Sequence, residues 1–96
     1  MKVVYSEQAL RDLVKLRSFI AGQNPDAAAR VAAGLVERLE NLGRFPHLGR
    51  AAGPAPGPEA LRDVVFGNYV VRYLPRSDVV IVLRIWHHYE DRGASR

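Results

Sequence analysis

Three short segments with the composition of β-strands follow one another in the second half of the chain, at residues 61–66, 69–74 and 79–86. Gly67 and Asn68 separate the first two and are typical of a two-residue hairpin turn, and a four-residue turn beginning at Pro75 separates the last two. Parallel neighbours need a crossover of a dozen or more residues, so connections this short predict three consecutive antiparallel strands.

Two amphipathic helices are predicted before these strands. Apolar residues recur at helical spacing from residue 9 to 20, after Ser6, which is a suitable N-cap. We expect Gly22 to end this helix and Asn24-Pro25 to start the next, whose apolar stripe runs from residue 28 to 42. Because only a few residues join the two helices, they should form an antiparallel hairpin. Residues 2–5 predict a strand before the first helix.

The predicted fold class is therefore α+β, in the order β-α-α-β-β-β, with the N-terminal helical hairpin packed on one face of a small antiparallel sheet. A chain of 96 residues, 48% hydrophobic and 25% charged, suits one globular domain, which we assign to residues 1–96. Residues 43–60 hold four of the six prolines and predict a loop, and residues 88–96 predict a C-terminal tail.

Composition excludes several classes of function. No apolar stretch approaches the length of a membrane span, and the opening Met-Lys-Val-Val-Tyr-Ser-Glu reaches charged residues too early for a secretory signal, so we expect a cytosolic protein without membrane association. The absence of cysteine excludes a disulfide scaffold and a thiolate zinc site. Adjacent strand residues such as His87 and His88 diverge, and His47 is distant in sequence, so we predict no metal site. No nucleotide-binding motif is present, and we expect no cofactor.

Strand alternation predicts which side chains share a face. The last strand has an apolar row expected to pack on the helices: Val79, Ile81, Leu83 and Ile85. Arg84 and Trp86 then point away from the helices, together with Arg72 of the middle strand. His88 joins them if the strand continues, whereas His87 points the other way. This cluster suits nucleic acid or an acidic peptide, and a solvated sheet face is the alternative that the residues leave open.

Short motifs distributed along nearly the whole chain resemble the ParE/RelE toxins of bacterial type II toxin–antitoxin pairs. No single motif is specific, but they occur in the order and at the spacings expected for the family. The motifs are Ser6-Glu7-Gln8-Ala9, Asn24-Pro25-Asp26-Ala27-Ala28, Phe45-Pro46-His47-Leu48-Gly49-Arg50, Tyr69-Val70-Val71-Arg72-Tyr73 and Val82-Leu83-Arg84-Ile85-Trp86-His87. The resemblance implies a toxin that a cognate antitoxin protein neutralises by binding.

The family has two branches with different targets. The ParE-like branch poisons DNA gyrase, and the Pro-x-x-Gly-Arg corner and the Arg-Ile-Trp-His ending look more like this branch. Where the RelE-like branch carries a sheet-face arginine in the middle strand, this chain has Val70. The resemblance therefore favours a gyrase inhibitor. Its expected target-binding residues are Arg62, Arg72, Arg84, Trp86 and His87.

Two alternatives remain open. In a RelE-like endoribonuclease that cleaves ribosome-bound mRNA, His88 and Tyr89 would be the catalytic residues that transfer protons, while Arg72 and Arg84 would hold the phosphate. The other alternative is a member of the family that binds its antitoxin and is no longer toxic.

Overall fold

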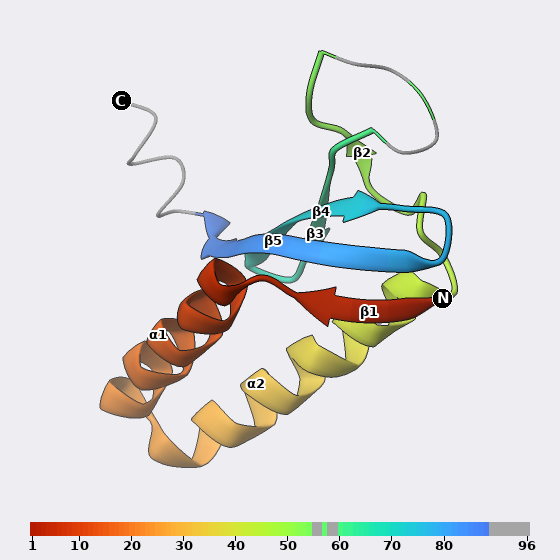
Figure 1. Cartoon of the computed structure of the whole chain (residues 1–96). Helices are drawn as coiled ribbons and strands as arrows, with labels where there is room; N and C mark the ends of the chain where they lie inside the picture. The colour runs from red at the N-terminus through yellow and green to blue at the C-terminus, as the bar shows by residue number, and fades with distance from the viewer. Residues whose placement is uncertain (55–56, 58–59, 89–96) are drawn as a thin grey trace.

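The computed structural model describes residues 1–54, 57 and 60–88, and consists of a helical hairpin packed beneath one face of a five-stranded sheet (Figure 1). This arrangement confirms the predicted α+β class. The predicted tail from Tyr89 onward lies outside the described residues. The elements are β1 (Lys2–Tyr5), α1 (Glu7–Gln23), α2 (Pro25–Glu40), the 3₁₀ turn η1 (Asn41–Gly43), β2 (Arg50–Ala51), β3 (Arg62–Phe66), β4 (Tyr69–Pro75) and β5 (Val79–His87).

The sheet has the strand order β1-β5-β4-β3-β2, and its antiparallel β3-β4-β5 meander is the one that the short turns predict. It is mixed rather than wholly antiparallel, because β1 pairs parallel to β5, with Lys2 opposite Val79. The helical hairpin and the first two meander strands lie between β1 and β5 in the sequence, which is ample chain for a parallel crossover. Within the predicted loop, Arg50 and Ala51 form a short edge strand on β3.

Both helices begin at the predicted caps. The Ser6 hydroxyl accepts a hydrogen bond from the Ala9 N–H at 3.0 Å, and the Asn24 side chain accepts one from the Ala27 N–H at 3.1 Å. The prediction that Gly22 ends α1 is wrong by a small margin, since the helix includes Gly22 and ends at Gln23. The extended backbone of Asn24, whose N–H still bonds to the Ile20 carbonyl, ends the helix instead.

A β-bulge in β5 changes which of its residues face the helices. Arg72 lies opposite Arg84, but the next residue of β4, Tyr73, lies opposite Val82, so that Leu83 is the extra residue. Strict alternation would place Val82 on the open face, whereas it is fully buried against the helices, as is Val80.

The predicted apolar row of β5 is therefore wrong for Val79, Ile81 and Leu83 and correct for Ile85, which is 3% exposed. The bulge at Leu83 reverses the alternation, so even-numbered residues face the core before it (Val80, Val82) and the odd-numbered Ile85 faces the core after it. The core combines both helices and the η1 turn with three strands: Ala9, Leu35, Leu39, Leu42, Val64, Val71, Tyr73, Val80, Val82 and Ile85.

The Pro-x-x-Gly-Arg corner anchors the long loop to the sheet. The Gly49 N–H donates a buried hydrogen bond to the Tyr73 hydroxyl at 2.8 Å, and the Gly49 carbonyl accepts one from Arg62 at 2.6 Å. A Cβ atom at position 49 would lie 2.6 Å from the Asp63 carbonyl oxygen, which is closer than van der Waals contact allows. Glycine is needed here because two backbone segments approach each other.

We expect Gly49→Ala to lower the free energy of unfolding by about 1–3 kcal/mol, because either the loop or β3 must move to admit the methyl group. Urea denaturation followed by circular dichroism measures the change. Gly53→Ala is the matched control, since its Cβ would find its nearest neighbour, Leu61, at an ordinary 3.7 Å. Equal stability of the two variants would contradict the proposed role of Gly49.

Candidate functional site

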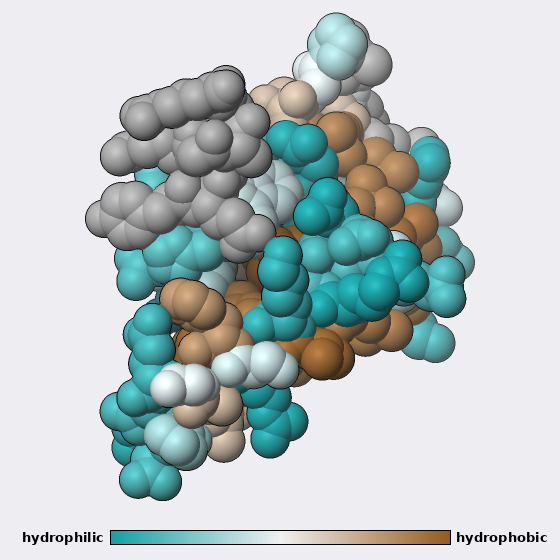
Figure 2. Space-filling model, turned by 90° about the vertical axis from the view of Figure 1, so that its left-hand side faces the viewer, coloured by the Kyte–Doolittle hydropathy of each residue, from teal (hydrophilic) through white to brown (hydrophobic). Residues whose placement is uncertain are grey.

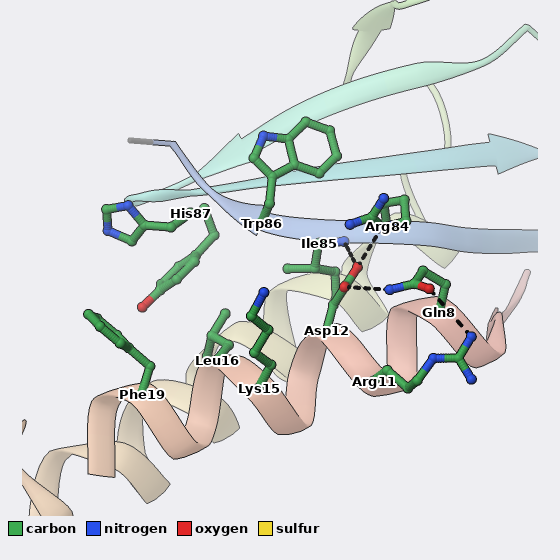
Figure 3. Close-up of a pocket in the computed structure, with 11 residues that line it drawn as sticks. Gln8, Arg11, Asp12, Lys15, Leu16, Phe19, Arg84, Ile85, Trp86 and His87 are labelled. Atoms are coloured by element: carbon green, nitrogen blue, oxygen red, sulfur yellow. Dashed lines mark hydrogen bonds and ion pairs between the residues drawn. The ribbon is translucent and has the colours of Figure 1, made fainter. Parts of the chain in front are cut away.

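A groove of about 700 Å³ lies between α1 and the C-terminal half of β5 (Figure 3). It contains three of the five predicted target-binding residues, Arg84, Trp86 and His87. Its lining is made of Gln8, Arg11, Asp12, Lys15, Leu16, Phe19, Tyr69, Arg84, Ile85, Trp86 and His87. The size is that of a pocket for a small ligand or a short peptide segment.

Asp12 holds the two walls of the groove together. This residue is only 8% exposed, and one carboxylate oxygen accepts hydrogen bonds from the Ile85 N–H at 2.8 Å and from Arg84 Nε at 2.9 Å. The other oxygen accepts a bond from the Gln8 amide at 3.0 Å (Figure 3). Because these partners come from α1 and β5, the carboxylate fixes the helix against the strand.

The environment of Asp12 favours its charged form. Burial raises the pKa of this carboxyl, but the hydrogen bonds from Arg84, Ile85 and Gln8 and the positive charge of Arg84 outweigh burial, and the pKa lies below its ordinary value. Sequence reasoning did not select Asp12 as a site residue. A signal was present, since it is a carboxylate at helical spacing from Ala9 and Leu16 on the inward-facing side of α1.

Arg72, Arg84 and Trp86 lie together on the open face of the sheet. Arg72 is directly opposite Arg84 across β4 and β5, and its guanidinium lies 5.2 Å from the centre of the Trp86 ring. Each arginine also pairs with a carboxylate: Arg72 forms two bonds to Asp63, at 2.9 and 3.0 Å, and Arg84 bonds to Asp12. The positive charge of this face is therefore partly balanced by the protein itself.

The remaining predicted site residues are spread over three places. Arg62 lies at the loop corner, where it donates to the carbonyls of Gly49 and His47, and it does not line the groove. His87 lies in the groove with its ring edge-on to Tyr69, at 5.4 Å between ring centres.

His88 follows the end of β5, is exposed, and donates its backbone N–H to the Asn68 carbonyl at 2.7 Å. Since β5 ends at His87, the strand alternation does not extend to His88. Tyr89 lies outside the described residues, so no distance links it to His88.

The groove opens on an amphipathic surface. Figure 2 views the end of the molecule where α1 and the end of β5 lie, and shows hydrophilic and hydrophobic residues side by side. On the α1 wall, Arg11 and Lys15 alternate with Leu16 and Phe19, and 65% of Phe19 is exposed. This mixture of cations and exposed apolar surface suits a partner that carries both acidic and apolar groups.

Residues 1–54, 57 and 60–88, which the structure describes, were searched for a metal site and for a membrane-spanning helix. In this part of the chain, no three side chains among the histidines, aspartates and glutamates come together in a way that would hold a metal ion. Neither of its helices has the length and apolar character that crossing a membrane requires.

Comparisons with known proteins agree with the resemblance in the sequence. Residues 3–92 match the family described as the ParE toxin of the type II toxin–antitoxin system, parDE. Two toxins of Caulobacter vibrioides, named RelE1 and RelE2, are each 36% identical to the chain. The match to RelE1 covers 94% of this chain and 96% of the relative, and the match to RelE2 covers 90% and 93%.

Solved structures show the same fold. The ParDE system from P. aeruginosa contains a chain that superposes with a TM-score of 0.73 at 19% identity, over 91% of this chain and 95% of that one. The toxin–antitoxin complex RelBE2 from Mycobacterium tuberculosis gives a TM-score of 0.64 at 26% identity, over 90% and 95%. The family match and the 36% identity to these relatives define a toxin of a type II toxin–antitoxin system. The chain belongs to the ParE toxin family, within the ParE/RelE superfamily.

Proposed function

We propose that this toxin inhibits DNA gyrase by binding it, and that a cognate antitoxin neutralises the toxin. The observation that carries the proposal is the pairing of both open-face arginines with carboxylates of the same chain, beside Trp86. Phosphate groups are best held by arginines whose charge is not already balanced. A tryptophan flanked by arginines is instead typical of the residues that dominate protein–protein binding.

The endoribonuclease alternative has two observations in its favour. The Caulobacter relatives carry the name RelE, and His88 is exposed just after the end of β5. Against it, Val70 is 7% exposed and lies opposite Trp86, at the position where the RelE-like branch is expected to carry an arginine. A valine at this position has no positive charge with which to stabilise the phosphate in the transition state of RNA cleavage.

The antitoxin part of the proposal is supported by apolar surface on the helical hairpin. Leu10 is 51% exposed, Val14 67% and Val36 38%, and a partner that covers them would remove this apolar area from water. The similar structures from P. aeruginosa and M. tuberculosis are of a toxin–antitoxin system and a toxin–antitoxin complex. We therefore expect this chain to bind an antitoxin protein as well.

Two measurements, one on the purified protein and one in cells, distinguish the candidate targets. We expect the purified toxin to inhibit DNA supercoiling by gyrase, and we expect primer extension after brief induction to find intact mRNA. His88→Ala should leave gyrase inhibition unchanged within about twofold, because His88 does not line the groove. New mRNA breaks within codons that His88→Ala abolishes would overturn the gyrase proposal and establish the nuclease.

A further inference from the structure

We propose that Asp63 determines the specificity of the open face: its carboxylate holds Arg72 against Trp86 for a protein target, and it keeps the same guanidinium from binding the phosphates of nucleic acid. The role of Asp63 rests on the proposed function, in which the open face contacts a protein, and it adds the residue that selects the class of partner. The register of the strands, the geometry of the Asp63–Arg72 pair and its charge support this role.

Four charged side chains form one row across the open face, which is the side of the sheet turned away from the helices (Figure 1). Asp63 of β3 lies opposite Arg50 of β2 on one side and opposite Arg72 of β4 on the other. Arg72 in turn lies opposite Arg84 of β5. Directly opposed residues of antiparallel strands share a face, with Cβ atoms about 5 Å apart. The carboxylate of Asp63 therefore separates the cations of Arg50 and Arg72.

The Asp63–Arg72 pair fixes the plane of the guanidinium. Arg72 Nε donates to one carboxylate oxygen at 2.9 Å, and Nη2 donates to the other at 3.0 Å. Two parallel bonds of this kind define the orientation of the fork as well as its position. The guanidinium carbon lies 5.2 Å from the centre of the Trp86 ring, within the range of a cation–π contact. Asp63 thus positions Arg72 on the indole that we assign to the target surface.

The same pair makes Arg72 a poor ligand for phosphate. A phosphate binds an arginine fork through two parallel bonds, as a carboxylate does, and Asp63 already occupies the Nε and Nη2 edge of Arg72. The two side chains are 38% and 28% exposed, so water screens their attraction less than that of a fully exposed pair. A phosphate would also approach the negative charge of Asp63, and a repulsive element of this kind rejects the wrong class of partner.

Removing this charge should allow the row to bind nucleic acid. The probe is a short fluorescein-labelled oligouridylate, titrated with purified full-length toxin while fluorescence anisotropy is recorded. We expect Asp63→Asn to bind the probe at least about tenfold more tightly than the unmodified toxin does. Asp63→Glu keeps the charge and should bind it as weakly as the unmodified toxin. Asp63→Thr is neutral and favourable in a strand, and should give the same result as Asp63→Asn.

Two further variants separate this local effect from a general gain of positive charge. Asp78→Asn makes the same change in net charge at an exposed aspartate between β4 and β5, and should alter the affinity for the probe by less than about threefold. In the double variant Asp63→Asn/Arg72→Ala, the gain in affinity should be lost, because Arg72 is the group that binds the phosphate. Circular dichroism verifies that each protein is folded.

Trp86 reports the position of Arg72, because it is the sole tryptophan of the chain. Asp63→Asn should raise the quenching constant of its fluorescence by acrylamide at least about 1.5-fold, since the guanidinium no longer covers the ring as closely. The double variant should be quenched no more than Arg72→Ala alone, because Asp63 acts on the indole through Arg72. A role of Asp63 in stability alone would not produce this dependence. The same Asp63→Asn variant should need at least about fivefold more toxin for half-maximal inhibition of gyrase.

Several outcomes would overturn the role of Asp63. These are an equal affinity of Asp63→Asn and Asp78→Asn for the oligouridylate, a gain that persists without Arg72, or unchanged quenching of Trp86. Tight binding of the probe by the unmodified toxin would overturn it as well. The anisotropy and quenching measurements use the toxin alone, whereas failure of the proposed function would appear as unimpaired supercoiling in the presence of the unmodified toxin, so the two failures are distinguishable.

Discussion

Replacing Trp86 with alanine is expected to raise the toxin concentration for half-maximal inhibition of gyrase supercoiling by about 30-fold or more, equivalent to about 2 kcal/mol of binding free energy. The indole lines the groove where it meets the open face, and the Arg72 guanidinium lies 5.2 Å from its centre. Truncation removes both the aromatic contact and the support that positions Arg72. A dose–response series in a supercoiling assay measures the effect.

Two variants control this prediction. Trp86→Phe keeps an aromatic ring under Arg72 and should retain most of the activity, within about fivefold. Phe45→Ala removes an aromatic side chain that is 56% exposed but lies outside the groove lining, and it should inhibit gyrase like the unmodified toxin. If Phe45→Ala lost as much activity as Trp86→Ala, the assignment of the target surface would fail. Thermal unfolding of each variant verifies that the fold is intact.

The second large effect is expected at Asp12, where alanine should lower the free energy of unfolding by about 2–4 kcal/mol. Without the carboxylate, the buried Ile85 N–H loses its acceptor and Arg84 loses its counter-charge. Asp12→Asn should cost less, because an amide oxygen can still accept one of these bonds. Urea denaturation gives both values, and a loss below about 0.5 kcal/mol in the alanine variant would show that Asp12 does not fix α1 to β5.

The same residue makes a prediction about pH. The pKa of Asp12 in the folded protein lies below its value in the unfolded chain, which is about 3.9, so the unfolded state binds the proton more tightly. The contribution of Asp12 to stability is therefore fully present above about pH 4 and is lost as the pH falls through the lower, folded pKa.

We expect the stability difference between the unmodified toxin and Asp12→Asn to be constant near neutrality and to shrink below about pH 4. Urea denaturation of both proteins at a series of pH values measures this difference, and other carboxylates largely cancel because the two chains share them. A difference that grows on acidification would mean that the folded pKa of Asp12 is raised rather than lowered.

Local sequence signals were sufficient for most of the secondary structure. Ser6, Asn24 and Pro25 are capping residues whose effect depends on neighbours within a few positions, and Gly67-Asn68 is a turn whose geometry depends on its own backbone. The family resemblance could also be recognised from the sequence, because its motifs are short and local, some at these caps and at the loop corner and others along β4 and β5. The parallel pairing of β1 could not be predicted from local signals, since its partner strand, β5, lies more than 70 residues away in the sequence.

The candidate site shows the same division. Alternation along β4 and β5 was enough to bring Arg72, Arg84 and Trp86 to one face, because all three lie on the same side of the bulge and near one register. The role of Asp12 was not predictable, since its bonds to Arg84 and Ile85 join residues 72 and 73 positions apart. Arg62 looked equivalent to the other strand arginines in sequence, yet it bonds to loop carbonyls.

The sequence by itself thus determined the helices, the meander, the fold class and the family, because these follow from short-range propensities and from residue types at fixed local spacing. Only the tertiary structure decided which residues of β5 face the core, that β1 pairs parallel to β5, and that a groove lies beside α1. The bulge at Leu83 arises from how β4 and β5 pair, and the groove exists because β1 stops at Tyr5 and a buried carboxylate of α1 takes its place on the strand edge. Each of these depends on contacts between distant segments, which no local pattern encodes.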